Sequence, residues 1–124
     1  MIGYVTLGTN DARRSIAFYD ALLAPLGVKR VSPNDRITLW SVAKGQPMLG
    51  IAVPFDGQPA SSGNGAMVAV NVGSKATVDT MHASALGLGA TDDGAPGPRG
   101  GGPFYGGYIR DPDGNKLALF CLDG

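Results

Sequence analysis

The chain has 124 residues, of which 44% are hydrophobic, so it is long enough to form one ordinary domain with a buried core. Ten basic residues balance ten acidic ones, and no basic stripe or polybasic run indicates a nucleic-acid or membrane partner. No apolar run approaches the roughly 20 residues of a membrane span, and no secretory signal is recognisable. Cys121 is the single cysteine, which excludes an internal disulfide, so we expect a cytoplasmic protein.

The first half of the chain predicts a β-α-β-β-β succession. Residues 2–8 have the alternation of a strand, and Thr9-Asn10-Asp11 offers capping side chains for a helix that ends at about Leu26. Gly27 suits the left-handed conformation that often follows a helix. The remaining strands are predicted at residues 28–31, 36–43 and 48–53.

A polar connection rich in Gly, Pro and Ser divides the chain into a module of about 1–54, a linker of 55–65 and a module of about 66–124. The pattern then restarts with a strand at 67–72 and a helix that Ser74 can cap. Val5 and Val68 correspond at an offset of 63 residues, as do Asp11 and Ser74. This spacing of about half the chain predicts two copies of one unit.

Two strands, Phe104–Arg110 and Lys116–Leu122, end the second half through the turn Asp-Pro-Asp-Gly-Asn at 111–115. Gly114 can supply the positive φ of a tight turn, and Asp111 can accept hydrogen bonds from its backbone. This hairpin and the opening strand with its cap resemble the glyoxalase / bleomycin resistance protein / extradiol dioxygenase (vicinal oxygen chelate) superfamily. The resemblance implies an α+β fold in which two tandem βαβββ modules form a curved, cup-like mixed sheet with helices outside.

The resemblance also implies a divalent metal held by His and Glu or Gln from four inner strands. Carried onto this chain, the ligand positions are Tyr4, Leu49 or Gly50, Met67 and Ala118. None of them carries the imidazole or carboxylate that such metals require, the chain contains no Glu, and its one histidine, His82, falls within the second helix. We therefore expect that the metal site is lost and that no cofactor is bound. The alternative is a shifted register in which Asp residues substitute.

Without a metal, the cup predicts a mainly apolar pocket with polar tips. The resemblance places Tyr108 where the extradiol branch carries a substrate-facing aromatic hydroxyl. The pocket candidates are Tyr4, Thr6, Trp40, Met67, Ala69, Tyr108, Ala118 and Phe120. The alternative is that the large members of this set fill a closed core.

Residues 94–107 contain seven glycines and predict either a mobile flap at the rim of the cup or simple slack between strands. In the flap interpretation, Arg99, Phe104 and Tyr105 close over a ligand. His82 shares a helix face with Asp79, so the two can form a His–Asp pair, and the alternative is a histidine that only packs or lies at the surface.

These observations lead to the hypothesis of a homodimeric glyoxalase-like protein that binds a small, partly apolar molecule without metal. A second hypothesis is a lyase, isomerase or dioxygenase of the same superfamily. That enzyme would hold a metal in another way or use metal-free acid–base chemistry by Tyr4, Tyr108 or His82. A third is a fold retained only for protein–protein contact.

Overall fold

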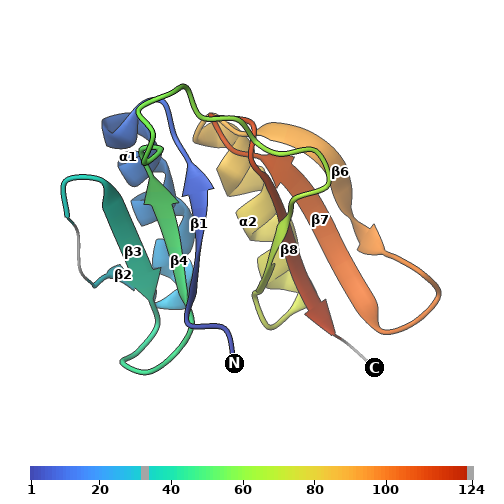
Figure 1. Ribbon diagram of the computed structural model, residues 1–124. Helices are drawn as coiled ribbons and strands as arrows, with labels where there is room; N and C mark the ends of the chain where they lie inside the picture. Colours follow the sequence, from blue (N-terminus) through green and yellow to red (C-terminus); the bar gives the residue numbers. More distant parts are fainter. Residues whose placement is uncertain (32–33, 123–124) are drawn as a thin grey trace. The chain divides into compact units, whose positions relative to one another are not determined.

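Two units of the same plan make up the computed structural model, which describes residues 1–31 and 34–122 (Figure 1). The first unit is Met1–Ser62 and the second is Gly63–Gly124. The change from one to the other falls inside the polar connection at 55–65. Part of this connection is tied to the first unit, because Asn10 Oδ1 accepts a hydrogen bond of 2.7 Å from the backbone N–H of Ala60.

The first unit has the predicted β-α-β-β-β order with a short 3-10 turn after its helix. The sheet order is β1-β4-β3-β2, with β1 parallel to β4 and the other pairs antiparallel. The elements are β1 (Tyr4–Gly8), α1 (Ala12–Leu23), η1 (Ala24–Leu26), β2 (Lys29–Arg30), β3 (Ile37–Ser41) and β4 (Met48–Ala52).

The second unit repeats this arrangement. Its sheet order is β5-β8-β7-β6, again with the first strand parallel to the last and the others antiparallel. The elements are β5 (Val68–Asn71), α2 (Lys75–Gly87), β6 (Thr91–Pro98), β7 (Phe104–Arg110) and β8 (Lys116–Leu122). The predicted α+β fold with two tandem βαβββ modules is therefore confirmed.

Local interactions start both helices where the sequence predicts, whereas α1 ends at Leu23 and η1 continues to the predicted end at Leu26. Asp11 accepts a hydrogen bond of 3.1 Å from the N–H of Arg14, and Ser74 accepts one of 3.1 Å from the N–H of Thr77. Each satisfies one of the N–H groups that a helix start leaves without a partner. Gly27 follows η1 with a φ of 73°, which a residue with a Cβ adopts only with strain.

Strand β6 corrects one prediction. Residues 94–107 were predicted as a flap or slack, but residues up to Pro98 form β6, which pairs with β7. The pairing contains register shifts between Asp92 and Gly94 and between Gly94 and Gly97. Glycine-rich strands lack the alternation that identifies a strand in sequence, and here the partner strand supplies the ladder.

The turn between β7 and β8 is built around one buried carboxylate. Asp111, which is 4% exposed, accepts hydrogen bonds of 2.9 Å from the N–H groups of Asp113 and Asn115 through Oδ1. Its Oδ2 accepts a third, of 3.0 Å, from Nδ2 of Asn115. Gly114 has a φ of 88°, as the turn requires. These contacts fix the register of the hairpin.

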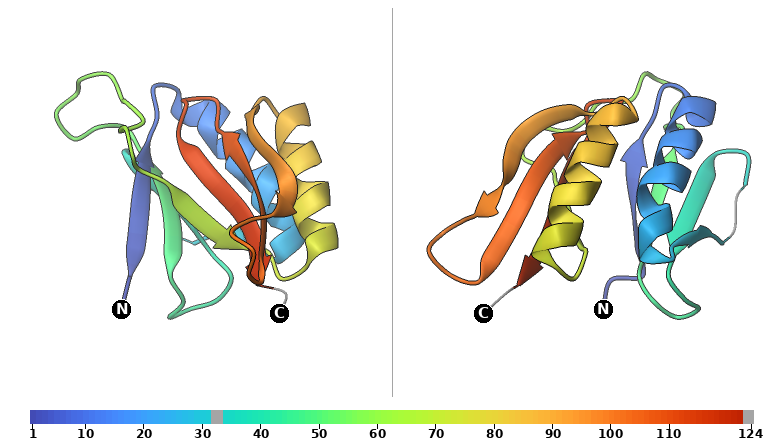
Figure 2. Two further views of the ribbon diagram at one scale, coloured as in Figure 1. Left: turned by 90° about the vertical axis from the view of Figure 1, so that its right-hand side faces the viewer. Right: turned by 180° about the vertical axis from the view of Figure 1, so that it is seen from behind.

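Each helix lies against one face of the sheet of its own unit, as Figure 2 shows, and the other face of each sheet is here called its open face. Side chains alternate between the two faces along a strand. The helix-covered faces hold the cores. In the first unit the buried residues include Leu7, Tyr19, Leu22, Trp40 and Ile51. In the second they include Val78, Met81, Ile109, Leu117 and Leu119.

Candidate functional site

The open face of the first sheet carries two of the predicted pocket residues. Tyr4 pairs with Met48, and Thr6 pairs with Gly50, so these four residues share the open face. Tyr4 is 55% exposed, and Thr6 is exposed. Both side chains are therefore available to a ligand that approaches this sheet.

Trp40 does not belong to that face, and its prediction as a pocket residue is wrong. Its ring is 1% exposed and lies 5.6 Å from the ring of Tyr19 in α1. Its Nε1–H donates a hydrogen bond of 2.9 Å to Asp20, also in α1. The reason is the register: Leu39 pairs with Gly50 on the open face, so the next residue points to the helix.

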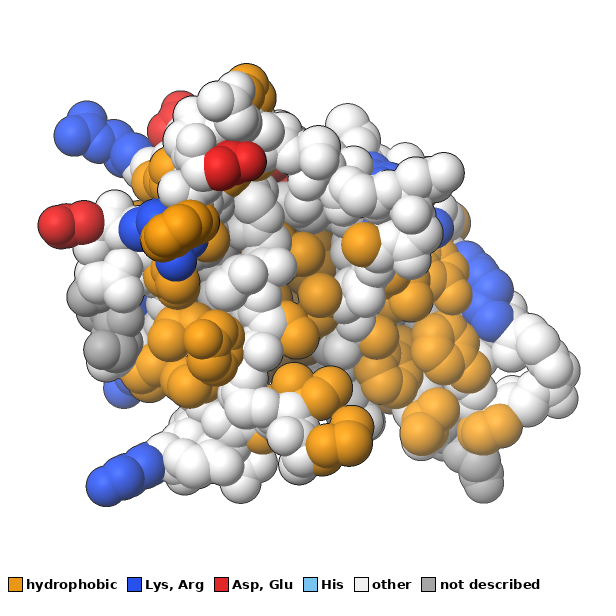
Figure 3. Space-filling model, in the orientation of Figure 1, with side chains coloured by type: hydrophobic (Ala, Val, Ile, Leu, Met, Phe, Trp, Pro, Cys, Tyr) orange, Lys and Arg blue, Asp and Glu red, His pale blue; other side chains and the backbone are white. Residues whose placement is uncertain are grey.

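The open face of the second sheet carries most of the remaining pocket candidates. Met67 is 47% exposed and Ala69 is exposed, whereas Tyr108 and Phe120 are half-buried. Ala118 pairs with both Ala69 and Tyr108 but is fully buried, so it offers no surface to a ligand. Figure 3 looks onto this face and shows hydrophobic side chains gathered over β7 and β8.

The three residues predicted for the flap separate in the structure. Phe104 and Tyr105 lie in β7, not in a loop, so their role in a mobile flap is wrong. The ring of Phe104 stacks on Phe120 at 5.2 Å with an angle of 8° between the ring planes, on the open face. Tyr105 faces α2 and donates a hydrogen bond of 2.6 Å to Asp79, which raises the pKa of the Tyr105 hydroxyl above its usual value.

Arg99 follows β6 directly and turns back over the open face. Its guanidinium carbon lies 5.5 Å from the centre of the Tyr108 ring. The ammonium nitrogen of Lys116 lies 5.1 Å from the same ring. Sequence reasoning did not identify Lys116. The signal was its place two residues before Ala118, which puts it on the same face of β8.

The family's metal-ligand positions do not fit a metal. The pairing of β1 with β4 places Gly50, rather than Leu49, on the face of Tyr4. A Cβ at Gly50 would lie 2.6 Å from Cδ2 of Leu39, so no donor side chain fits there without displacing that leucine. The other positions present a phenol, a thioether and a methyl group, and hard or borderline cations prefer imidazole or carboxylate. Within residues 1–31 and 34–122, no three His, Cys or Asp side chains group as a metal site would need.

His82 pairs with a different carboxylate from the predicted one. Its Nε2 lies 3.0 Å from Oδ1 of Asp92 in β6, whereas Asp79 binds Tyr105. The backbone N–H of Gly94, together with His82, holds the pKa of Asp92 below its usual value. His82 itself is buried between α2 and the sheet, where Cδ2 would meet any Cβ placed at Gly107. This pair lies under the helix, away from the open face.

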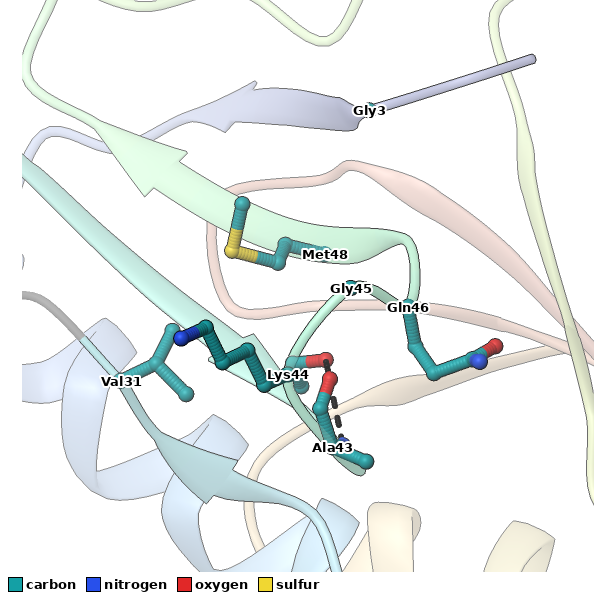
Figure 4. A pocket seen from close by; sticks show the side chains of 8 residues that line it. Gly3, Val31, Ala43, Lys44, Gly45, Gln46 and Met48 are labelled. Atoms are coloured by element: carbon teal, nitrogen blue, oxygen red, sulfur yellow. Dashed lines mark hydrogen bonds between the residues drawn. The ribbon is translucent and has the colours of Figure 1, made fainter.

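A pocket of about 510 Å³ lies at one end of the first sheet, around the turn that joins β3 to β4 (Figure 4). It is lined mostly by backbone and aliphatic groups, together with the amine of Lys44 and the thioether of Met48. None of the predicted pocket residues belongs to it. It therefore gives no support to the predicted binding site.

The glyoxalase/bleomycin resistance protein/dioxygenase superfamily model matches residues 1–119 of this chain. A glyoxalase/bleomycin resistance protein from Albidiferax ferrireducens is 36% identical, with a TM-score of 0.86 and 98% of each chain covered. A protein from Agrobacterium tumefaciens solved by NMR is 25% identical, with a TM-score of 0.77 over 100% of this chain and 98% of that one. An enzyme of the same family description from Burkholderia phytofirmans has 20% identity and a TM-score of 0.77 over 97% of each chain, which shows a shared fold.

No curated protein matches the chain significantly. Neither helix in the described part of the chain is both long and apolar enough to cross a membrane.

Proposed function

The chain belongs to the glyoxalase/bleomycin resistance protein/dioxygenase superfamily, and from that premise we propose that it binds a small, partly apolar molecule without the family's metal. One observation carries the proposal. Where the family resemblance expects metal donors, the open faces present the exposed side chains of Tyr4 and Met67 instead. Aromatic and thioether groups recognise apolar surface, and the phenol adds one hydrogen bond.

The open face of the second sheet supports the same proposal. The stacked rings of Phe104 and Phe120 add apolar aromatic area to it. Tyr108 lies on the same face, two strand positions from the row of Phe120. Ligand sites typically combine such apolar area with a few polar groups that fix orientation.

A thermal-shift screen tests the proposal with aromatic carboxylates, aromatic amides and glutathione conjugates as probes. A compound that binds only the native protein at 100 times its Kd stabilises it by about 2.7 kcal/mol. We expect a rise in Tm that is lost in Met67→Ala. Val42→Ala is the matched control, because Val42 is also an exposed apolar residue, at 57%, but lies beyond the end of β3.

Three results would contradict the proposal. One is the absence of any Tm rise across the panel. Another is an equal loss of the rise in both alanine variants. The third is a stoichiometric equivalent of Ni, Zn, Fe or Mn in protein purified without added metal, measured by elemental analysis.

The second candidate function is metal-free acid–base catalysis by an enzyme of the same superfamily. The observation that favours it is the Tyr108 hydroxyl, which forms no hydrogen bond within the described residues. A Tyr108→Phe variant separates the two functions. Loss of turnover with retained binding favours an enzyme, and retained binding of a compound that is never converted favours a binding protein.

We also propose that the protein acts in the cytoplasm as a homodimer. Exposed apolar side chains near the strand ends support the homodimer, since Ile2 is 55% exposed and Leu122 is 62% exposed. Light scattering coupled to size exclusion measures the oligomeric state. A single monomeric species at micromolar concentration would contradict the proposal.

A further inference from the structure

The ring of Tyr108 lies over a glycine in the neighbouring strand. Tyr108 pairs with Gly94 of β6, which has a φ of 151°. A Cβ at Gly94 would lie 2.8 Å from Cδ2 of the Tyr108 ring. The ring therefore covers the place where a side chain of β6 would stand, and this explains the glycine in that strand.

Two cations lie over this one ring, Lys116 at 5.1 Å and Arg99 at 5.5 Å from its centre. The negative face of an aromatic ring attracts a cation, but the attraction is worth only about 0.5–1 kcal/mol at an exposed site. It does not neutralise either charge. The Tyr108 ring therefore has two positive groups beside it on the open face.

Among the residues that the structure describes, Lys116 and Arg110 share a single carboxylate, that of Asp93. Oδ2 of Asp93 lies 3.3 Å from Nζ of Lys116 and 3.1 Å from Nε of Arg110. Arg110 and Lys116 thus share one acidic side chain, which leaves an excess of one positive charge at this pair.

The charge of Arg99 has no acidic partner within the described residues. Its guanidinium donates hydrogen bonds of 2.5 Å to the carbonyl of Ala95 and 3.3 Å to that of Pro98, and both acceptors are neutral. A guanidinium that is oriented but not neutralised is suited to bind a carboxylate.

The apolar part of the same face lies within one small molecule's length of the Tyr108 ring and its cations. Phe120 is two residues from Ala118, the cross-strand partner of Tyr108, so its row lies about 7 Å along the strands. A planar aromatic group placed against Phe120 and Phe104 can therefore extend an acidic group to the cations.

We propose that this surface, made of Arg99, Tyr108, Lys116, Phe104 and Phe120, recognises a planar aromatic carboxylate. The inference rests on the proposed function and adds the charge and shape of the ligand. Its electrostatic part resides in Arg99 and Lys116, and its apolar part resides in the phenylalanine pair.

The test compares 2-naphthoate with its neutral analogue 2-naphthamide by isothermal titration calorimetry. We expect the carboxylate to bind about tenfold more tightly, since a charge-assisted hydrogen bond is roughly twice as strong as a neutral one. The difference should shrink as NaCl is raised, because salt screens exposed charges.

Arg99→Gln should weaken naphthoate binding severalfold and so reduce the preference for the carboxylate over the amide. Lys116 should retain part of that preference, and continued binding of the amide shows that the variant is folded. Arg99→Lys should keep much of the preference. Arg36→Gln is the matched control: Arg36 also lies over an aromatic ring, 5.3 Å from that of Phe55, and also binds a carbonyl, that of Val53. This control should bind naphthoate as the parent does.

The outcomes separate this inference from the proposed function. Equal affinity for the two compounds, or equal losses in Arg99→Gln and Arg36→Gln, overturns the carboxylate inference while leaving a small-molecule site. Failure of both compounds to bind at millimolar concentration overturns the inference. If no compound of the wider thermal-shift panel binds either, the proposed function fails with it.

Discussion

Replacing Asp111 by alanine should destabilise the second unit more than any other single change to an acidic side chain that we consider. The carboxylate is buried and accepts three hydrogen bonds, two from backbone N–H groups and one from Asn115. Alanine leaves these donors without partners in a region where Asn115 is 2% exposed. Hydrogen bonds to a charged group contribute about 1.5–3 kcal/mol each and are not additive, so we expect a loss of about 3–4 kcal/mol.

Asparagine at the same position should cost roughly half as much. Its carbonyl oxygen can still accept from the two backbone N–H groups. Its amide, however, faces the Nδ2 donor of Asn115, which had bound Oδ2 of the carboxylate. The order of stability is therefore expected to be wild type, Asp111→Asn and Asp111→Ala.

Urea unfolding followed by far-UV circular dichroism measures these differences. Asp56→Ala is the control, because it makes the same change of charge and removes one hydrogen bond of 2.9 Å from the N–H of Gln58 in an exposed turn. A surface change of this kind is expected within about 0.5 kcal/mol of wild type. If Asp111→Ala and Asp56→Ala unfold at the same urea concentration, the buried carboxylate does not hold the turn, and the reasoning fails.

Three further predictions follow from the helix-covered faces. Trp40→Phe should cost about 1–2 kcal/mol in urea unfolding, since it removes the hydrogen bond to Asp20 and some buried area, and no loss would contradict the described packing. Asp92 has a pKa held below its usual value by a backbone N–H and an imidazole, so the stability that it contributes is present above about pH 4 and is lost as the pH falls through the folded-state pKa. Asp92→Asn should therefore reduce the fall in Tm at acidic pH. An unchanged fall in Tm would refute the assignment. Tyr105 has a raised pKa, so its contribution to stability is present below about pH 10 and is lost as the pH rises through the folded-state pKa. Asp79→Asn should make one tyrosine ionise at lower pH in an ultraviolet titration. A titration identical to that of the wild type would count against the hydrogen bond.

The sequence was sufficient to predict local structure where the contact that determines it joins residues at most four positions apart. The caps at Asp11 and Ser74 and the turn at Asp111 all bind backbone groups of that range. Such contacts follow from residue type and spacing, with little dependence on the rest of the chain. The repeat of these signals at an offset of 63 residues also predicted the paired modules.

Strand β6 could not be predicted from the sequence, because its composition is that of a loop. Four of its eight residues, Gly94, Pro96, Gly97 and Pro98, are of types that weaken or avoid strands. Pairing with β7 supplies the hydrogen bonds that the local sequence does not predict. The same pairing brings Asp93 to Lys116 and Arg99 over Tyr108, contacts between residues that are distant in sequence.

The sequence by itself determined the order of elements, the helix starts and the hairpin turn, because each depends on neighbours along the chain. Only the tertiary structure decided that Trp40 packs under α1, that His82 binds Asp92, and that Gly50 rather than Leu49 shares a face with Tyr4. The physical reason is the two-residue period of a strand. A displacement of one position moves a side chain from one face of the sheet to the other, and the partner strand sets that position.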